Sequence, residues 1–317
     1  MVKIAFWDNQ LCERGTTVAL YDYAYYNKYL LNNESIIIYN TTRPENDYDV
    51  IEKFKKEFEV YGVSNFMYAD DILKKTKCDI LYIIKAGENE GQISKIIKTV
   101  VHCVFNCNQP HGDIYASIAP WVHNNNNKYP YVPHMIKLPD NDNNLRKNLN
   151  IPEDATVYGR HGGYEQFDIP YVHNIVYNVA KNFSNIYFIF VNTKKFCPDL
   201  PNIIHIDKII DLNKKVEFIN TCDAMMCGRS DGEVFSLSQG EFSFKNKPII
   251  TTRIGYEGDV HLLGNKAIWY DNTNLYNILI SFNRIEAKNY DWNAYKEYTP
   301  EKVMKKFKEV FIDSLET

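Results

Sequence analysis

Two glutamates with seven residues between them are the most informative pair of chemically active side chains in this 317-residue chain. Glu233 and Glu241 lie in a segment, 223–252, that predicts a short strand, a polar loop, a helix over 232–244 and a further strand. On such a helix the two carboxylates would be about 80° apart around the axis and about 12 Å apart along it. They could then contact two ends of one elongated ligand, while the free N–H groups at the helix start would suit a diphosphate.

The rest of the chain must position this segment, and it alternates predicted strands and helices from end to end. In the first half, strands are predicted at 2–7, 35–39, 60–63, 78–84 and 100–105, and helices at 16–31, 50–58 and 69–76. In the second half, strands are predicted at 156–159, 186–191, 203–206, 224–227, 248–251 and 267–270, and helices at 170–182, 212–221, 232–244, 275–282 and 300–315. This alternation, with nearly continuous apolar strands, predicts an α/β fold of two Rossmann-like, doubly wound halves.

A segment rich in proline and asparagine, 130–148, separates the two series and reads as a connector. We therefore expect a first domain over 1–138, a second over 139–285, and a helical segment over 286–317 that packs back toward the first. Ligands of parallel sheets bind outside the carboxyl ends of the strands, so a cleft shared by the two domains is the expected site.

Composition excludes several classes of function. The net charge of -4 and the pI near 6.1 give no general attraction to nucleic acid. No apolar stretch is long enough to span a membrane, and the amino terminus lacks the features of a signal peptide. The seven cysteines are then expected to be reduced, in a cytoplasmic protein. Cys103 and Cys107 lack a second ligand pair at zinc spacing, and Asp140 and Asp142 lie in the connector, so no metal is expected.

The segment 223–252 resembles the E-x7-E signature of retaining GT-B glycosyltransferases, especially glycosyltransferase family 4. The run 202–224 is similar to the strand, helix and acidic-Ala run that precede this signature, and 157–163 resembles the first strand and loop of the family's donor domain. The similarity covers 136–270, whereas the first half matches only in architecture. The resemblance implies a GT-B fold and transfer of a hexosyl group from a nucleotide diphosphate sugar to an acceptor hydroxyl, with retention and without a metal.

The resemblance also assigns residues. Glu241 would bind the ribose of the nucleotide, Glu233 would lie at the transferred sugar as a catalytic residue, and Arg160 would neutralise the leaving diphosphate. The expected donor-binding residues also include Gly159, His161, Gly162, Arg229 and the backbone N–H groups of Val234 and Phe235. The family usually places a lysine shortly after the arginine, and none stands there in this chain. Arg229, His161 and Lys194 are the candidates to replace it, and Arg229 could equally form a surface pair with Asp231.

In the first half, Gly15 and Arg14 follow the first strand, where the family places a glycine-containing loop near the donor. Gly15 could also serve only to relieve the turn between strand and helix. His102 is the expected catalytic histidine of this half, and the expected acceptor-side residues are Lys85, Glu88 and His111. Either histidine could instead be a hydrogen-bonded structural residue, and Lys85 and Glu88 could be solvated loop charges.

Three other functions remain open. A sugar-nucleotide epimerase of the same fold would react without an acceptor. A non-catalytic GT-B protein that binds a glycan or a partner is compatible with the missing lysine. A nicotinamide-dependent dehydrogenase is the weakest alternative, because no G-x-G-x-x-G follows either first strand.

Overall fold

The computed structural model describes residues 1–123 and 128–315, and the chain folds into two compact units. Unit 1 comprises Met1–Met135 together with Tyr298–Thr317, and unit 2 comprises Ile136–Glu297. The C-terminal segment thus belongs to the same unit as the N-terminal half. Within the described ranges, no helix is both long and apolar enough to cross a membrane.

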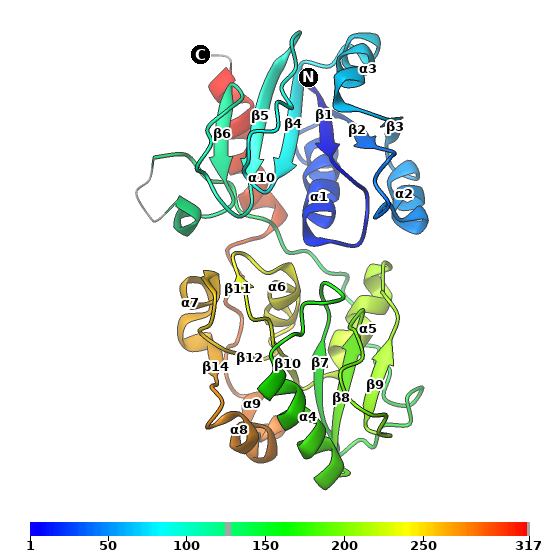
Figure 1. The fold of residues 1–317 in the computed structure, drawn as a ribbon, viewed down its shortest axis with the longest axis vertical. Helices are drawn as coiled ribbons and strands as arrows, with labels where there is room; N and C mark the ends of the chain where they lie inside the picture. The colour runs from blue at the N-terminus through cyan, green and yellow to red at the C-terminus, as the bar shows by residue number, and fades with distance from the viewer. Residues whose placement is uncertain (124–127, 316–317) are drawn as a thin grey trace. The chain divides into compact units, whose positions relative to one another are not determined.

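Unit 1 is built on a six-stranded, wholly parallel sheet with the strand order β3-β2-β1-β4-β5-β6 (Figure 1). Its strands are β1 (Lys3–Asp8), β2 (Glu34–Asn40), β3 (Glu59–Val63), β4 (Ile80–Lys85), β5 (Lys98–Cys103) and β6 (Ile114–Ser117). Its helices are α1 (Gly15–Tyr29), α2 (Tyr48–Lys55), α3 (Ala69–Thr76) and α10 (Pro300–Phe311), with short 3-10 turns η1 (Phe66–Tyr68), η2 (Pro120–His123) and η4 (Asp313–Leu315). Strand β4 is buried along its whole length, as a central parallel strand requires.

Two connections distinguish this unit. The last helix, α10, comes from the far end of the sequence and packs against α1 and β6. The crossover between β4 and β5, residues 86–97, contains no helix, although parallel strands are usually joined by one. The surface that such a helix would cover is therefore left to an extended loop.

Unit 2 repeats the plan with the order β14-β12-β10-β7-β8-β9, and all pairs are parallel. Its strands are β7 (Thr156–Arg160), β8 (Ile186–Val191), β9 (Ile203–Ile206), β10 (Ala224–Met226), β12 (Ile249–Thr251) and β14 (Ala267–Trp269); β11 (Gly232–Glu233) and β13 (Tyr256–Glu257) form a separate small ladder. Its helices are α4 (Pro170–Asn182), α5 (Leu212–Thr221), α6 (Leu237–Phe244), α7 (Gly258–Leu263), η3 (Gly264–Lys266), α8 (Leu275–Ser281) and α9 (Arg284–Ala287).

Both sheets have the doubly wound order 3-2-1-4-5-6 when the strands are counted within each unit. The strand order reverses between β1 and β4 in unit 1, and between β7 and β10 in unit 2. Ligands of such sheets bind at this reversal, outside the carboxyl ends of the strands. Residues that follow β7 and β10 are therefore the first candidates for a binding site.

Candidate functional site

Arg160 is the last residue of β7 and lies at the reversal point of the unit 2 sheet. Its side chain is almost wholly buried, and burial lowers its pKa to about 10, so it is charged at neutral pH. The guanidinium donates to the hydroxyl of Thr193 and to the carbonyl of Gly163, the latter at 2.9 Å. Among the described residues, no carboxylate lies within ion-pair distance of it. A buried cation held only by neutral groups is poised to receive an anion.

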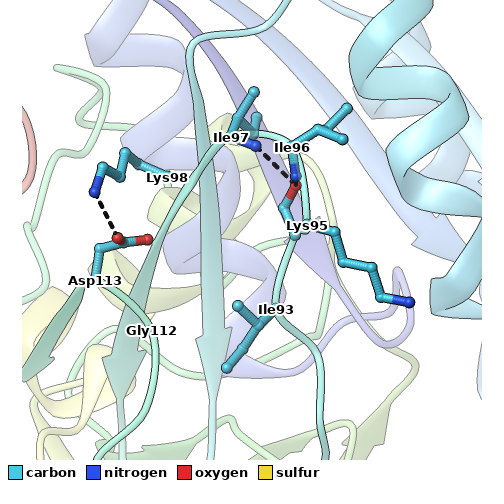
Figure 2. Close-up of a pocket in the computed structure, with 8 residues that line it drawn as sticks. Ile93, Lys95, Ile96, Ile97, Lys98, Gly112 and Asp113 are labelled. Carbon is cyan, nitrogen blue, oxygen red and sulfur yellow. Dashed lines mark hydrogen bonds and ion pairs between the residues drawn. The ribbon is translucent and has the colours of Figure 1, made fainter.

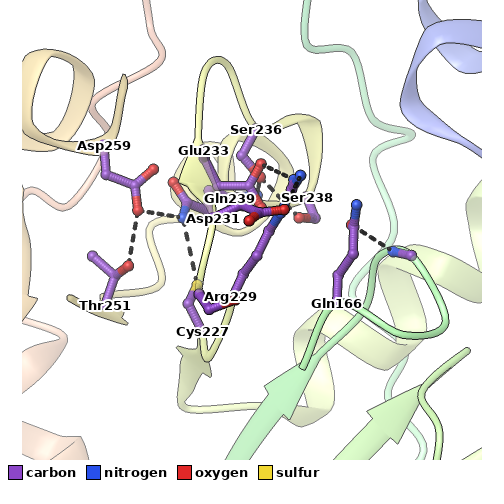
Figure 3. Close-up of polar contacts among 12 residues, drawn as sticks. Gln166, Cys227, Arg229, Asp231, Glu233, Ser236, Ser238, Gln239, Thr251 and Asp259 are labelled. Atoms are coloured by element: carbon purple, nitrogen blue, oxygen red, sulfur yellow. Dashed lines mark hydrogen bonds and ion pairs between the residues drawn. The ribbon is translucent and has the colours of Figure 1, made fainter. Parts of the chain in front are cut away.

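A second arginine, Arg229, lies in the loop after β10, also at the reversal point. Its Nη1 is 3.1 Å from Glu233 Oε2, and its Nη2 is 3.7 Å from Asp231 (Figure 3). Arg229 and Arg160 both act electrostatically on Glu233. The structure therefore brings together three residues that the sequence identifies as candidates.

The structure corrects the expected helix over 232–244. Glu233 lies in β11, paired with β13, and α6 begins only at Leu237. Gly232 has φ +68°, and Ser236 caps α6 by accepting the N–H of Gln239, so the residues between them lie before the helix. Glu233 and Glu241 thus do not share a helix, and the angular argument for them was wrong.

The same correction applies to the backbone donors expected at the helix start. Val234 and Phe235 precede the cap and are buried, so their N–H groups are not those of the first turn. The first turn of α6 is Leu237, Ser238 and Gln239 instead.

Glu233 is electrostatically unusual. Burial raises the pKa of its carboxyl to about 7, against the favourable charges of Arg229 and Arg160. The nearby carboxyl of Asp259 also raises this pKa. At neutral pH Glu233 is therefore divided between its protonated and ionised forms, a property typical of functional carboxyls.

Asp259, at the start of α7, was not identified from the sequence. It is buried, accepts hydrogen bonds from Gln239 and Thr251 at 2.9 and 2.8 Å, and burial raises its pKa to about 6 (Figure 3). Its other oxygen, Oδ1, is buried without a hydrogen-bond partner in the described part of the chain. The only sequence signal for this turn was the glycine pair Gly255 and Gly258, whose added Cβ atoms would collide with backbone.

Glu241 lies on the buried side of α6 between two basic residues. Its Oε1 accepts a hydrogen bond from Lys215 at 2.9 Å, and its Oε2 is 2.9 Å from His161 Nε2. Burial opposes ionisation of Glu241, but Lys215 and His161 prevail and lower its pKa to about 2. Burial lowers the pKa of His161, while Glu241 acts to raise it. Lys215 was missed because a lysine on an amphipathic helix reads as solvated.

The structure distinguishes the three residues that were candidates to replace the missing lysine. Arg229 lies beside Glu233 and Arg160, and His161 faces Glu241. Lys194 has an exposed side chain that pairs with the equally exposed Glu165 at 3.2 Å. Lys194 therefore has no contact with the other candidate residues.

Gly159 was expected to bind the donor, but in the structure it has a packing role. A Cβ added to it would come within 2.2 Å of Cys222 Sγ and 3.1 Å of Phe218, because β7 lies directly on α5. By contrast, Gly162 has φ +151° and lies against the guanidinium of Arg160. Gly162 keeps a place at the site, whereas Gly159 allows the strand and helix to approach.

We expect Gly159→Ala to lower the free energy of unfolding by about 1–3 kcal/mol, as overpacking of a core usually does. Urea unfolding of the variant measures the loss. Cys222→Ala removes the closest colliding atom, so the double variant should recover part of it. Equal stability of Gly159→Ala and the wild type would contradict the packing role.

His102 is not available for catalysis. It is fully buried in unit 1, with Nδ1 2.6 Å from the hydroxyl of Tyr82 and Nε2 2.8 Å from the carbonyl oxygen of Val132. Burial lowers its pKa to about 4, so the ring is neutral. The expected catalytic role of His102 is therefore corrected to a structural one.

The other candidates of unit 1 are spread over several loops. His111 is buried beside Tyr115, with Nδ1 2.6 Å from the carbonyl of Gln109. Lys85 ends β4 with its side chain buried and 3.0 Å from Glu90, so it is not a solvated loop charge. Glu88, Arg14 and Gly15 are exposed, Glu88 accepts a hydrogen bond from Asn106, and Arg14 precedes α1 without capping it.

The described residues contain no group of three His, Cys, Asp or Glu side chains that could hold a metal ion. The expectation that no metal is needed remains a prediction, because the chemistry of a bound substrate could complete a site.

No protein-family model matches the chain, and a search of curated proteins finds no match. Among solved structures, HepE of Anabaena in complex with UDP and glucose is similar, with a TM-score of 0.69 and 12% identity, over 98% of this chain and 99% of that one. A glycosyltransferase from Rickettsia africae gives a TM-score of 0.66 at 12% identity, over 100% and 99% of the chains.

A protein of Listeria monocytogenes proposed to be a UDP-N-acetylglucosamine 2-epimerase gives a TM-score of 0.64 at 12% identity, over 99% and 97% of the chains. Each similarity extends over almost the whole of both chains. Together they confirm the predicted fold class: the chain has the GT-B fold, with two Rossmann-like α/β domains of parallel strands.

Proposed function

We propose that the chain is a glycosyltransferase that moves a sugar from a nucleotide diphosphate sugar to an acceptor hydroxyl. The observation that carries this proposal is Arg160, a buried guanidinium without a carboxylate partner at the reversal point of the unit 2 sheet. A diphosphate would supply the missing negative charge, and bidentate contact with phosphate is the geometry that arginine favours. The bound UDP of HepE, and the UDP-glucose in a second HepE complex, support the same ligand class.

The proposed roles follow from the contacts. Arg160 and Arg229 lower the energy of the charge that builds on the diphosphate as the glycosidic bond breaks. Glu241, held ionised by Lys215 and His161, retains lone pairs that would accept hydrogen bonds from ribose hydroxyls. Glu233 would contact hydroxyls of the transferred sugar. Retention, with front-face attack assisted by the leaving phosphate, and independence from metal belong to this proposal through the resemblance to family 4.

A panel of UDP, GDP, ADP, dTDP and CDP tests the proposal by thermal unfolding, with and without EDTA. We expect UDP, at 100 times its dissociation constant, to stabilise the wild type by about 2.7 kcal/mol and to do so equally in EDTA. Glu241→Gln should lose most of this stabilisation because its amide no longer accepts ribose hydroxyls with both terminal atoms.

The control variant is Glu165→Gln, which changes an exposed carboxylate of the same unit and should respond to UDP as the wild type does. If no nucleotide stabilises the wild type, the transferase proposal fails and a non-catalytic binding protein takes its place.

A sugar-nucleotide epimerase is the second candidate, favoured by two carboxyls whose pKa values lie near neutrality, Glu233 and Asp259. Such groups suit removal and return of a proton at a sugar carbon. Incubation of the protein with UDP-N-acetylglucosamine alone, followed by proton NMR, separates the two. A new 2-epimer without any acceptor would support this candidate and contradict the transferase.

A further inference from the structure

A hollow of about 470 Å³ lies on unit 1, outside the carboxyl ends of β1, β2 and β3. Its far side is formed by the loop that joins β4 and β5 without a helix. The size is typical of a small-molecule site. None of the candidate residues identified in the sequence analysis lines it, so the proposed nucleotide chemistry does not account for it.

The loop is fastened on three sides, so the hollow is a built feature. Glu90 and Gln92 lie 3.0 and 3.5 Å from the buried ammonium of Lys85. Gln92 also donates to Asn9 at 2.9 Å, directly after β1. Asp70, at the start of α3, accepts hydrogen bonds from Ser94 Oγ and the backbone N–H of Lys95.

Three asparagine side chains line the hollow, and the protein uses the amide oxygen of each. Asn9 Oδ1 accepts from Gln92, Asn40 Oδ1 accepts from the backbone and hydroxyl of Thr42, and Asn65 Oδ1 accepts from the N–H of Met67. The NH₂ group of each amide has no hydrogen-bond partner in the described ranges. These amides stand at or just after the ends of three neighbouring strands, so the hollow offers N–H donors whose paired acceptors are already occupied.

The charged groups of the hollow, like its amides, leave more donors than acceptors free for a ligand. The carboxylates of the hollow, Asp70 and Glu90, are engaged by the loop and by Lys85. Arg43 and Lys95 also line it, and neither side chain has an ion-pair or hydrogen-bond partner within residues 1–123 and 128–315. The groups left for a ligand are therefore two cations and three amide donors.

The opposite side of the same loop provides a contrast. A second hollow of about 510 Å³ there contains Lys98, but Lys98 is paired with Asp113 at 2.9 Å (Figure 2). Lys95 lines both hollows, yet its ammonium extends away from Lys98 and Asp113 (Figure 2). The imbalance between donors and acceptors thus belongs to the first hollow.

We infer that the hollow beside Asn9, Asn40 and Asn65 binds an anionic group, a carboxylate or a phosphate, carried by the sugar acceptor. Such a group offers only acceptors at neutral pH, which matches the free N–H groups and the two cations. The inference deepens the proposed function, on which it rests, by giving the acceptor a chemical class: an acidic or phosphorylated glycan.

Saturation-transfer NMR on the full chain tests this with glucuronate, glucose 6-phosphate and glucose as probes. We expect at least one anionic probe to bind about tenfold more tightly than glucose, since charged hydrogen bonds are roughly twice as strong as neutral ones. Arg43→Gln and Lys95→Gln should each weaken that binding several-fold. Binding of glucuronate alone would assign a carboxylate, and binding of glucose 6-phosphate alone would assign a phosphate.

Lys98→Gln is the matched control, because it removes the same charge three residues further along the chain, at the start of β5 and beside the other hollow. Its affinity for the anionic probe should equal that of the wild type. Equal affinities for glucose and both anions, or equal losses in Lys95→Gln and Lys98→Gln, would overturn the inference. UDP binding is measured on the same samples. UDP binding without preference for anionic probes refutes only this inference, whereas anion preference without UDP binding refutes only the proposed function.

Discussion

Arg160→Gln is expected to weaken binding of UDP about 10- to 100-fold while leaving the unliganded protein as stable as the wild type or more so. Hydrogen bonds to charged groups contribute about 1.5–3 kcal/mol, and the substitution would remove those that Arg160 makes to the diphosphate. In the unliganded protein the guanidinium is buried without a carboxylate partner, so its removal relieves an uncompensated charge. Calorimetric titration with UDP and urea unfolding measure the two effects.

Arg146 provides the matched control within the same unit. It is also buried, but it pairs with Asp223 at 2.9 Å and donates to the carbonyls of Pro152 and Ala155. Arg146→Gln should therefore lower the free energy of unfolding by about 3–5 kcal/mol and leave the UDP affinity of the folded protein unchanged. Similar behaviour of the two variants would mean that Arg160 is a structural residue, and the proposed diphosphate site would lose its main support.

The contrast between these arginines shows what sequence reasoning can and cannot find. Arg160 ends a short apolar run and Arg146 stands in an asparagine-rich stretch, yet nothing in their local sequence predicts which one has a carboxylate partner. Arg160 was identified only because 157–163 resembles the donor-domain loop of a known family. The partner of Arg146 is 77 residues away, and such pairings depend on sheet topology.

Helix starts illustrate the same limit at a local scale. The bounds of α4 agree with the prediction because Pro170 stands at its first position, where proline is favoured. For α6 the prediction began five residues early. The extended backbone of Gly232–Glu233 is stabilised by pairing of β11 with β13, a contact with a segment more than twenty residues later. Local sequence propensity does not reflect pairing with a distant segment, so Glu233 was predicted to lie on a helix although it lies on a strand.

The buried polar networks were also not predicted from the sequence. Lys215 and Asp259 carry strong electrostatic interactions, yet Lys215 stands in a stretch whose pattern is that of an ordinary surface helix, and Asp259 stands in a stretch for which no element was predicted. The apolar periodicity of α5 predicts which face is buried, but it does not predict that a lysine beside that face will meet Glu241. Sequence reasoning therefore named Glu233, Glu241 and Arg160 as candidates, while it missed the residues that set the charge states of the two glutamates.

The largest pH effect on stability is expected from two buried histidines of unit 1. His102 and His134 are both enclosed, His102 against Tyr82 and His134 against Tyr23, and burial lowers their pKa values to about 4 and about 3. In the unfolded chain the pKa of histidine is about 6.5. The unfolded state therefore binds more protons below this pH, and stability falls as the pH decreases from 6.5 toward 4 and 3. Between pH 7 and pH 5 the loss is about 2 kcal/mol for each histidine.

Three carboxyls change stability in the opposite direction with pH, and their effect must be separated from that of the histidines. Asp8, Glu233 and Asp259 have pKa values raised by burial, so their contribution to stability falls as the pH rises. They are common to the wild type and to His102→Gln, and the difference between the two proteins cancels them. In urea unfolding, the stability of His102→Gln relative to the wild type should improve by about 2 kcal/mol on going from pH 7 to pH 5.

The exposed His261 is the control position, since His261→Gln should keep the pH dependence of the wild type. A constant difference between His102→Gln and the wild type across this range would show that His102 is protonated as readily in the folded as in the unfolded chain. In that case its ring would be accessible to solvent, and its exclusion from the catalytic residues would be wrong. The same titration therefore tests both the buried network and the structural role assigned to His102.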